Sequence, residues 1–574
     1  RPTRRPVSDF HSPASPPRRK RIVTFAPAGP DQRLRAALAR RSETAPTDPE
    51  WASCNTAAEV HAAVSTEYVD VLLLDLRSSG SSAADAVQQG FALLDQLDSH
   101  QDVEARYAFH RIMALVADAD LVRADHWVAE LGARGVGSIL RAHPDSETRA
   151  QFEGRVAQAL ETLLGARAGG KIALAASGGG ITGIYFELGA LKCLDDCIDR
   201  PVNDFDMFFG ISAGAVVTGV LSAGYSVSEF MAALAGHPGG RVPDLDLQLF
   251  RLGHINFPDM KRRLFAGSEL FWKALYSLVW RRRLPRLNDL FLDYSALIGP
   301  PFRSDGFERM LREILSQPGA TNDFRQLRRP LYIGATDQDL RGHVLFGSEG
   351  ADHVPISRAI QASLSVHPAF SSVEIEARYY EDGAVTRTSN FVEAIGRGAK
   401  LVFVLDPFVP YVSHEPGAIN RQGVLYNIDQ DIRALSYTRF ANTRNWVLRK
   451  HPDVSTYTFL PSNRVRRLLS ANPMDHRPYL EIWRGAYVST FQRIKRLQHR
   501  MQGDRAAHGI RLDLSQAEAV AKRLDTVVEP GFADFFPDGQ VAIETPPLSV
   551  SPQPAAQAVP RNPKPAQILH RKAI

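Results

Sequence analysis

The sequence predicts an α/β protein in which two domains follow one another, each built on a sheet of largely parallel strands between helices. Short apolar runs, typical of buried strands, alternate with segments of helical periodicity from residue 21 to about residue 165. The same alternation begins again at residue 171. The chain of 574 residues is also longer than one hydrophobic core usually organises.

Composition and charge narrow the class of protein. Hydrophobic residues make up 44% of the chain and charged residues 23%, as in ordinary globular proteins. The formal net charge of +5 is small for this length, and much of the basic excess lies in residues 1–21 and 261–286. Such local clusters fit contact with an anionic lipid surface or with nucleic acid, whereas a globally basic nucleic-acid binder would be more uniformly charged. We therefore expect no nucleic-acid partner.

Cysteine usage and hydropathy indicate the compartment. Cys54, Cys193 and Cys197 are too few for a disulfide scaffold and lack the CxxC spacing of metal sites. The sequence contains no apolar run of about 18 residues and no apolar core of a signal peptide. We expect a cytoplasmic protein that makes peripheral contact with a membrane.

The first domain is expected at residues 21–165. Five apolar runs separated by helical segments predict crossover connections and hence a parallel, doubly wound, flavodoxin-like sheet. The predicted strands are residues 22–26, 51–54, 69–76, 112–117 and 136–140. The predicted helices are residues 32–41, 57–64, 82–97, 122–131 and one that starts near residue 146.

This domain resembles a response-regulator receiver domain. Asp75 ends the third strand, where that family carries its phosphoacceptor. However, Pro27 and Ala28 stand where the family has an acidic pair for Mg²⁺, Ala117 stands where a Ser or Thr is usual, and no Lys follows the fifth strand. Without Mg²⁺ and Lys, phosphoryl transfer loses its electrostatic support. We expect a pseudo-receiver with a structural Asp75, used for homodimerisation or for binding a regulatory partner.

The second domain, expected at residues 166–540, opens with a glycine-rich loop. An apolar strand at 171–176 runs into SGGGITG (177–183) and then into a helix predicted at 184–194. Backbone amides and the positive end of the helix dipole would converge there on an anion. The anion could be a dinucleotide pyrophosphate, a nucleotide phosphate or the oxyanion of an acyl intermediate.

A nucleophile motif follows about thirty residues later. A strand predicted at 205–209 leads into GISAG (210–214) and then into a small-residue helix at 215–224. This is GxSxG in the strand–turn–helix context that its chemistry needs, with Gly210 and Gly214 making room for a strained turn at Ser212. A serine also needs a base. Asp382 supplies a candidate in EDGAV (381–385), after a helix at 356–364 and strands near 373–375 and 377–380.

In this order, SGGGITG, GISAG, AIQASLSVHPAFSSV (359–373) and EDGAV resemble the patatin-like phospholipase family over residues 171–406. The resemblance implies that Ser212 is the nucleophile and that Asp382 is the base that contacts its hydroxyl. It also implies that the amides of Gly178, Gly179 and Gly180 form the oxyanion hole. Neither a catalytic histidine nor a metal or other cofactor is implied.

Other residues have weaker signals. Thr182 stands where the family commonly has Arg or Lys, so the charge beside the glycine loop is missing. Histidines occur in the domain, but none lies in a setting that marks a catalytic triad: His237, His254, His343, His353 and His367. We interpret Asp406 as a structural carboxylate at a strand end and Asn390 as a residue that frames the site.

Residues 256–292 are basic and aromatic and could form a helix at a lipid interface; a core-packed helix with a solvated basic end fits equally well. The region from about residue 424 to residue 536 reads as a mostly helical extension, including a helix at 479–501. Residues 1–20 and the Pro-rich tail at 541–574 are expected to be disordered.

The sequence thus predicts a lipid acyl-hydrolase of the phospholipase A or lysophospholipase type, which forms an acyl-serine intermediate on a carboxylic ester. Two alternatives stay open. One is an inactive lipid-binding regulator that carries a pseudo-receiver. The other is a nucleotide-binding protein that uses Gly178–Gly183, although no acidic residue ends a second strand at the expected distance.

Overall fold

The structure is a computed structural model, and it describes most of the chain outside the two ends and one long internal segment. The described residues are 19–27, 32, 36, 49–77, 82–100, 102–117, 121–143, 147–165, 169–243, 300, 302–367, 369–451, 453–472, 475, 477–541 and 543. The predicted basic aromatic stretch at 256–292 lies outside them, as do residues 1–18, nearly all of the predicted helix at 32–41 and the tail beyond residue 543.

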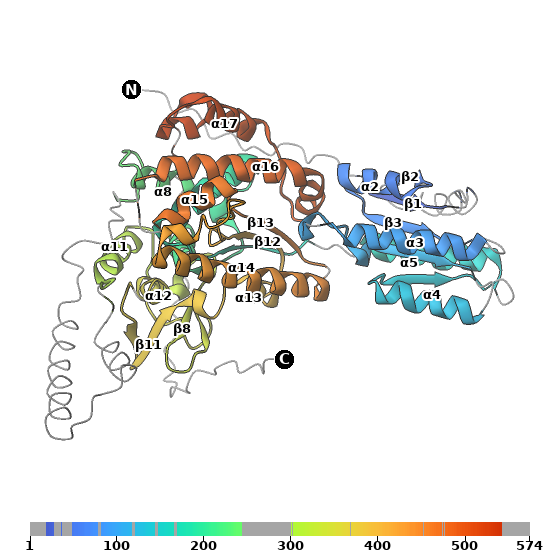
Figure 1. Ribbon diagram of the computed structural model, residues 1–574, viewed down its shortest axis with the longest axis horizontal. Coiled ribbons are helices and arrows are strands. Elements are labelled where there is room, and N and C mark those ends of the chain that lie inside the picture. Colours follow the sequence, from blue (N-terminus) through green and yellow to red (C-terminus); the bar gives the residue numbers. More distant parts are fainter. Residues whose placement is uncertain are drawn as a thin grey trace, which may run out of the picture. The chain divides into compact units, whose positions relative to one another are not determined.

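Two compact units make up the chain (Figure 1). The first comprises Arg1–Ala168 together with Leu497–Ala507, and the second comprises Gly169–Arg496 together with His508–Ile574. Among the described residues, no helix combines the length and the hydropathy needed to cross a bilayer.

The first unit is built on a five-stranded sheet in which every neighbouring pair is parallel. Its strands follow the spatial order β2-β1-β3-β4-β5, which is the flavodoxin-like order, so the predicted doubly wound sheet is confirmed. The strands are β1 (Arg21–Phe25), β2 (Glu50–Cys54), β3 (Val71–Asp75), β4 (Ile112–Val116) and β5 (Ser138–Arg141). The resemblance to a receiver domain itself stays a prediction.

Helices cover both faces of this sheet. One core cluster joins the strands to α2, α3 and α4, and another joins them to α5. The helices are α2 (Ala57–Thr66), α3 (Ser82–Asp98), α4 (Leu121–Ala133) and α5 (Arg149–Gly165). A capping box starts α2, because Thr56 accepts from the Glu59 amide while the Glu59 carboxylate accepts from the Thr56 amide.

Asp75, at the end of β3, is buried and fully engaged by a neighbouring side chain. Arg77 donates from Nε to Oδ1 and from Nη2 to Oδ2, each at 2.7 Å. A bidentate arginine occupies both carboxylate oxygens and compensates the burial of their charge. The ion pair with Arg77 favours the structural role expected of Asp75, which stays a prediction.

The second unit contains an eight-stranded mixed sheet. The strand order is β10-β11-β8-β7-β6-β12-β13, with β9 pairing with β8 off this path. The strands β8, β7, β6, β12 and β13, which are neighbours in this order, pair in parallel. The pairs β8–β9, β8–β11 and β10–β11 are antiparallel. The strands are β6 (Lys171–Ala176), β7 (Met207–Ile211), β8 (Leu331–Asp337), β9 (His343–Phe346), β10 (Val373–Ile375), β11 (Arg378–Asp382), β12 (Ala399–Leu405) and β13 (Ser455–Phe459).

Three of these strands were not predicted. β8 and β9 lie in a segment for which no strand was expected, and β13 lies inside the region interpreted as mostly helical. β13 pairs in parallel with β12 over five residues, from Leu401–Ser455 to Leu405–Phe459. The region from residue 424 onwards is therefore not merely a helical extension, because it completes the central sheet.

Helices sandwich the sheet. α13 and α14 pack on one face through Phe391, Ala394, Phe440 and Val447, and α15 and α16 lie on the other side of β12 and β13 (Figure 1). The helices of this unit are α6 (Gly180–Cys197), α7 (Ala213–Ser222), α8 (Val227–Leu234), α11 (Asp305–Leu315), α12 (Ile356–Ser363), α13 (Phe391–Gly396), α14 (Val424–Lys450), α15 (Asn463–Ala471), α16 (Tyr479–Ala506) and α17 (Ser515–Thr526). The predicted three-layer α/β/α arrangement is confirmed.

The long helix α16 contributes to both units. Its first part packs on α6, and its last turns, from Leu497 onwards, belong to the first unit. There Asp504 accepts a hydrogen bond from the Tyr68 hydroxyl at 3.0 Å and forms an ion pair with Arg111 at 3.5 Å. The Arg111 guanidinium also stacks over the Tyr68 ring, 4.8 Å from its centroid.

Gly189 provides a test of the contact between α6 and α16. A Cβ atom at this position would lie 2.8 Å from the Trp483 carbonyl oxygen and 2.9 Å from the Ala486 Cβ. We expect Gly189→Ala to lower the free energy of unfolding of the second unit by about 1–3 kcal/mol, because helix backbones cannot give way locally. Gly396→Ala is the control, since no atom lies within 4 Å of its added Cβ. Hydrogen exchange of α6 peptides measures both, and equal protection in the two variants would contradict the packing.

Candidate active site

The glycine loop lies between β6 and α6. At each of its three consecutive glycines, a different constraint excludes a side chain. A Cβ on Gly178 would stand 3.2 Å from the Ser212 Cβ, and one on Gly179 would stand 2.8 Å from the Pro407 Cγ. Gly180 has a φ of +66°, in the left-handed region that side chains avoid. The loop backbone is therefore packed closely against Ser212 at Gly178 and against Pro407 at Gly179, where side chains would clash.

The amides of this loop are available to a ligand. The backbone N–H groups of Gly178 and Gly179 make no hydrogen bond with the described part of the chain. α6 begins at Gly180, so its first-turn amides and its dipole add positive potential at the same place. Such an arrangement stabilises an anion, including an oxyanion that develops during acyl transfer.

Ser212 occupies a strained turn between β7 and α7. Its φ of 51° and ψ of −120° lie outside the regions favoured by non-glycine residues. The flanking glycines are required, because a Cβ on Gly214 would lie 2.3 Å from the Ala176 carbonyl oxygen and one on Gly210 would lie 2.5 Å from the Ala215 Cα. This is the geometry of a nucleophile elbow, with the hydroxyl held at the positive end of α7.

Strand β8 sets the distance between the serine and its partner. β7 pairs with β8 through Ile211 and Gly334, and β11 pairs with β8 through Asp382 and Ala335. Because Gly334 and Ala335 are consecutive, Ser212 and Asp382 emerge next to each other at one edge of the sheet. β8 is thus the element that joins the two motifs.

Asp382 is buried at the end of β11, and the Ser212 hydroxyl lies near enough to its carboxyl to lower its pKa. Its Oδ1 accepts from the Ala384 amide at 2.8 Å. Burial raises the pKa of this carboxyl to about 6, against the opposing effects of the hydrogen bonds from Ala384 and Ser212, while the nearby charge of Glu381 raises it further. A carboxylate with this pKa is a stronger base than Asp in water and is still ionised at neutral pH.

Residues 174–395 match the family model of the patatin-like phospholipases. This range, called the patatin-like region below, contains the glycine loop, Ser212 and Asp382, so the resemblance inferred from the motifs is confirmed at the level of the family model. No curated protein sequence matches the chain.

Two solved structures show a distant similarity. The crystal structure of VipD from Legionella pneumophila has 16% sequence identity and a TM-score of 0.23, with 44% of this chain and 52% of that chain covered. The type III effector protein ExoU has 16% identity and a TM-score of 0.21, with 64% of this chain and 68% of that chain covered. The chain thus spans about half the length of VipD.

Further contacts within the patatin-like region hold the elbow and the carboxylate loop. The Ser212 amide donates to Ser363 Oγ at 2.8 Å, and that hydroxyl donates to the Gly334 carbonyl at 2.6 Å. The Asp382 amide donates to the Ser365 carbonyl at 3.1 Å, and Thr336 Oγ1 donates to the Asp382 carbonyl at 3.0 Å. Sequence reasoning missed Ser363 and Ser365 as positioning residues, although both lie in a quoted motif.

Arg439 on α14 also holds the carboxylate loop, and it was not predicted. Its guanidinium donates to the Ala384 carbonyl at 2.7 Å and to the Val385 carbonyl at 2.9 Å. Both carbonyls belong to the turn directly after Asp382. The helix α14, which lies outside the patatin-like region, therefore contributes to the geometry of the site.

The histidines have other partners than Ser212. Burial and the nearby Arg387 lower the pKa of His343 to about 4, and its ring contacts Thr386 Oγ1 and Asn390 Oδ1, each at 3.0 Å. Asn390, directly before α13, therefore holds the His343 ring, and its expected role in framing the site stays a prediction. His237 stacks on Phe532, His353 pairs with Glu376 and His367 pairs with Glu381. His254 lies outside the described residues.

Behind the glycine loop lie two buried carboxyl groups. Burial raises the pKa of Glu187 well above its usual value, and the charge of Asp406 raises it further. Burial also raises the pKa of Asp406 to about 6, although the Phe408 amide and the nearby charges of arginines such as Arg433 oppose this. Both oxygens of Glu187 lack a hydrogen-bond partner among the described residues. Burial and the mutual repulsion of the two carboxylates thus both favour a proton on Glu187.

Arg433 brings a buried positive charge close to Thr182, the loop position at which the patatin-like phospholipases commonly have Arg or Lys. Its Nε pairs with Asp429 at 2.7 Å, and its terminal nitrogens donate to the carbonyls of Pro407 and Leu469 at 3.5 and 3.2 Å. The Thr182 hydroxyl donates to the same Leu469 carbonyl at 3.5 Å. α14 thus places the Arg433 guanidinium behind the glycine loop, where it contacts Pro407, the neighbour of Gly179.

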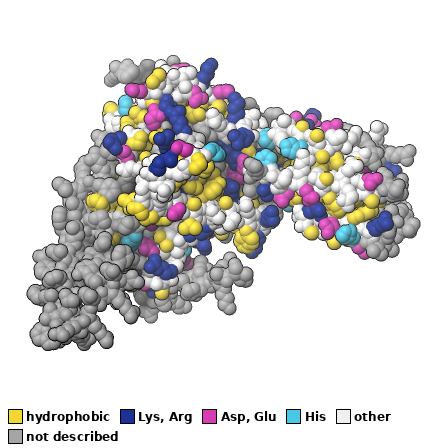
Figure 2. All heavy atoms as spheres, viewed as in Figure 1, with side chains coloured by type: hydrophobic (Ala, Val, Ile, Leu, Met, Phe, Trp, Pro, Cys, Tyr) yellow, Lys and Arg dark blue, Asp and Glu magenta, His cyan; other side chains and the backbone are white. Residues whose placement is uncertain are grey.

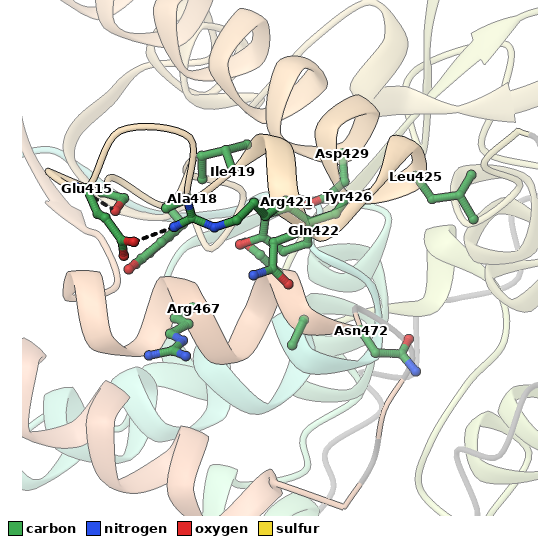
Figure 3. Close-up of a pocket in the computed structure, with 14 residues that line it drawn as sticks. Glu415, Ala418, Ile419, Arg421, Gln422, Leu425, Tyr426, Asp429, Arg467 and Asn472 are labelled. Carbon is green, nitrogen blue, oxygen red and sulfur yellow. Dashed lines mark hydrogen bonds and ion pairs between the residues drawn. The ribbon is translucent and has the colours of Figure 1, made fainter.

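A separate cavity of about 700 Å³ opens beside the start of α14. Its wall includes the ion-paired Glu415 and Arg421, together with Tyr426, Asp429 and Arg467 (Figure 3). Neither Ser212 nor Asp382 lines it. Asp429 links this wall to the glycine loop through Arg433 and Pro407.

Among the described residues, no three His, Cys, Asp or Glu side chains converge in the way that metal ligands do.

Asp406 gives a prediction on stability against pH. Its pKa of about 6 in the folded protein exceeds the value of about 3.9 for an unfolded chain, so its contribution to stability is lost as pH rises between these values. We expect Asp406→Asn to remove this loss while keeping the acceptor for the Phe408 amide. The free energy of unfolding of the variant, relative to the native protein, should rise by about 3 kcal/mol between pH 4 and pH 7. Urea titrations of the second unit across this range measure the difference, and a constant difference would contradict it.

Proposed function

We propose that this protein is a lipid acyl-hydrolase of the phospholipase A or lysophospholipase type that cleaves carboxylic esters through an acyl-serine intermediate. The observation that carries the proposal is that β8 brings Ser212 next to the buried carboxyl of Asp382, beside the Gly178 and Gly179 amides, which have no partner among the described residues. The match of residues 174–395 to the patatin-like phospholipase model supports a lipid ester as the substrate class.

In the first half-reaction, Ser212 Oγ attacks the carbonyl carbon of the ester while its proton moves to the Asp382 carboxylate. The negative charge that develops on the carbonyl oxygen is stabilised by the amides of Gly178, Gly179 and Gly180 and by the dipole of α6. The intermediate then collapses: the bond to the alcohol breaks, the alcohol takes the proton from Asp382, and the acyl group stays on Ser212.

In the second half-reaction, a water molecule gives a proton to Asp382 and attacks the acyl-serine. The same amides stabilise the second oxyanion, and Ser212 recovers its proton from Asp382 as the fatty acid leaves. One carboxylate thus serves as base and acid in turn, which its raised pKa favours because a group that must both accept and release a proton works best with a pKa near the operating pH. Direct contact with Ser212 removes the need for an intervening histidine.

A fluorophosphonate probe tests the nucleophile. We expect the protein to form a stable adduct on Ser212, and Ser212→Ala to abolish both the adduct and ester hydrolysis. Asp382→Asn should reduce both rates by about 10²- to 10⁴-fold, the usual contribution of a general base. Mass spectrometry of the labelled peptide and turnover of a short-chain aryl ester provide the measurements.

Ser222→Ala is the matched control for the labelling experiment. Ser222 is a buried serine at the opposite end of α7 from Ser212, and its hydroxyl donates to the Gly219 carbonyl at 3.0 Å. It should retain full labelling. An adduct that survives in Ser212→Ala, or full hydrolysis by the folded Asp382→Asn protein, would rule out the proposed chemistry.

The pKa of Asp382 predicts the pH dependence of hydrolysis. The base must be ionised, so kcat/KM should rise with pH, reach half its plateau near pH 6 and be about tenfold below the plateau at pH 5. Glu381→Gln removes a charge that raises this pKa and should shift the midpoint to lower pH. Asp406→Asn is the control and should leave the midpoint unchanged. A pH profile that is identical in the Glu381 variant would speak against Asp382 as the titrating base.

A further inference from the structure

Helix α14 has a solvent-exposed apolar stripe beside the candidate site. Leu425 and Leu435 are 78% and 73% exposed, and Val424, Ile428 and Ile432 are also exposed. At 100° per residue these five aliphatic side chains fall within a stripe about 100° wide. Figure 2 shows hydrophobic side chains gathered over this helix. A contiguous exposed stripe of this kind on a folded protein marks an interaction surface.

The same face continues into a basic and aromatic end. Trp446 lies 18 residues after Ile428, which is five complete turns, and is 60% exposed. Lys450 stands over its ring, 4.8 Å from the centroid, and Arg449 and Lys450 form the last turn of the helix. A tryptophan between apolar residues and cations has the composition of a side chain at the boundary between lipid tails and headgroups.

The stripe is attached to the carboxylate loop. Arg439 projects from this face and donates to the carbonyls of Ala384 and Val385. Val385 is itself 50% exposed, three residues after Asp382. A surface that binds α14 would therefore also meet the turn that carries the proposed base.

We propose that the exposed face of α14 docks the protein on an anionic lipid surface. The aliphatic stripe enters the boundary of the acyl chains, Trp446 lies at headgroup level, and Arg449 and Lys450 at the end of the helix face the lipid charge. Charge complementarity favours this occupant over a second copy of the chain. Asp431 is the one carboxylate on the exposed face of α14, so a second α14 offers little to pair with the basic end.

This inference goes beyond the proposed hydrolysis and does not depend on it. Binding is therefore measured on the full chain with Ser212→Ala, which cannot consume the vesicles through Ser212. Flotation with vesicles of phosphatidylcholine, with and without phosphatidylserine, gives the partition coefficient. We expect the protein to float with the phosphatidylserine vesicles, and less so with phosphatidylcholine alone.

Two paired variants separate the apolar and the electrostatic contributions. Ile428→Gln with Leu435→Gln keeps good helix formers and should lower the partition coefficient on either vesicle by about tenfold or more. Arg449→Gln with Lys450→Gln should lower it by about tenfold on phosphatidylserine vesicles only. Val528→Gln with Val541→Gln is the matched control, because these exposed valines lie outside α14. It should bind as the parent does.

Activity provides an independent check. In the chain with Ser212 intact, the variant of Ile428 and Leu435 should turn over a soluble aryl ester at the normal rate but lose activity on vesicles. Undiminished flotation of this variant would overturn the proposal. So would light scattering that shows a dimer which the same variant converts to a monomer, since a second copy would then cover the stripe. Flotation that persists in a chain without any esterase activity would leave docking intact and refute only the hydrolase.

Discussion

The contact between the Ser212 hydroxyl and the Asp382 carboxylate depends on the register of one strand. The serine and the carboxylate are 170 positions apart in the chain, and they meet because β7 and β11 border β8 at the consecutive residues Gly334 and Ala335. A shift of β8 by one residue would reverse the facing of its side chains and separate the pair. The hydrogen bonds of Ser363 and Thr336, both anchored around β8, secure this register. The backbone strain at Ser212 is tolerated because these contacts over-determine the turn.

The parts of the fold that follow local rules could be predicted from the sequence. β6 was predicted at its observed bounds, and the strand–turn–helix around Ser212 follows from small residues at required positions. β8 was missed because Gly334 and Ala335 weaken its strand pattern. A Cβ on Gly334 would lie 2.6 Å from Asn390 Nδ2, so the packing requires a glycine here. That glycine weakens the sequence signal of the strand. β13 was missed because it is a short strand between helices, and only its partner β12 reveals its role.

The supporting residues of the site could not be predicted, since their roles arise from tertiary contacts. Ser363 and Arg439 act through backbone groups of distant segments, and neither has a distinctive sequence neighbourhood. The spacing of apolar residues in α14 would normally indicate a buried face, and the period alone does not tell which side the core covers. Burial raises the pKa of Asp382 and Asp406 alike, yet one contacts a serine hydroxyl and the other lies beside Glu187. Burial thus has the same effect on the pKa at two strand ends whose neighbouring side chains differ.

The chain enters the first unit twice, and this affects how the protein acquires its structure during synthesis. Residues 1–168 emerge from the ribosome first, but the unit also contains Leu497–Ala507, with Leu497 and Met501 buried. The surface that these side chains cover stays open until every strand of the second sheet has been translated. Domains usually complete their folding in the order of their synthesis. Here the amino-terminal unit cannot be completed until most of the second unit has been synthesised, and a fragment that ends at residue 168 would lack the buried side chains of Leu497 and Met501.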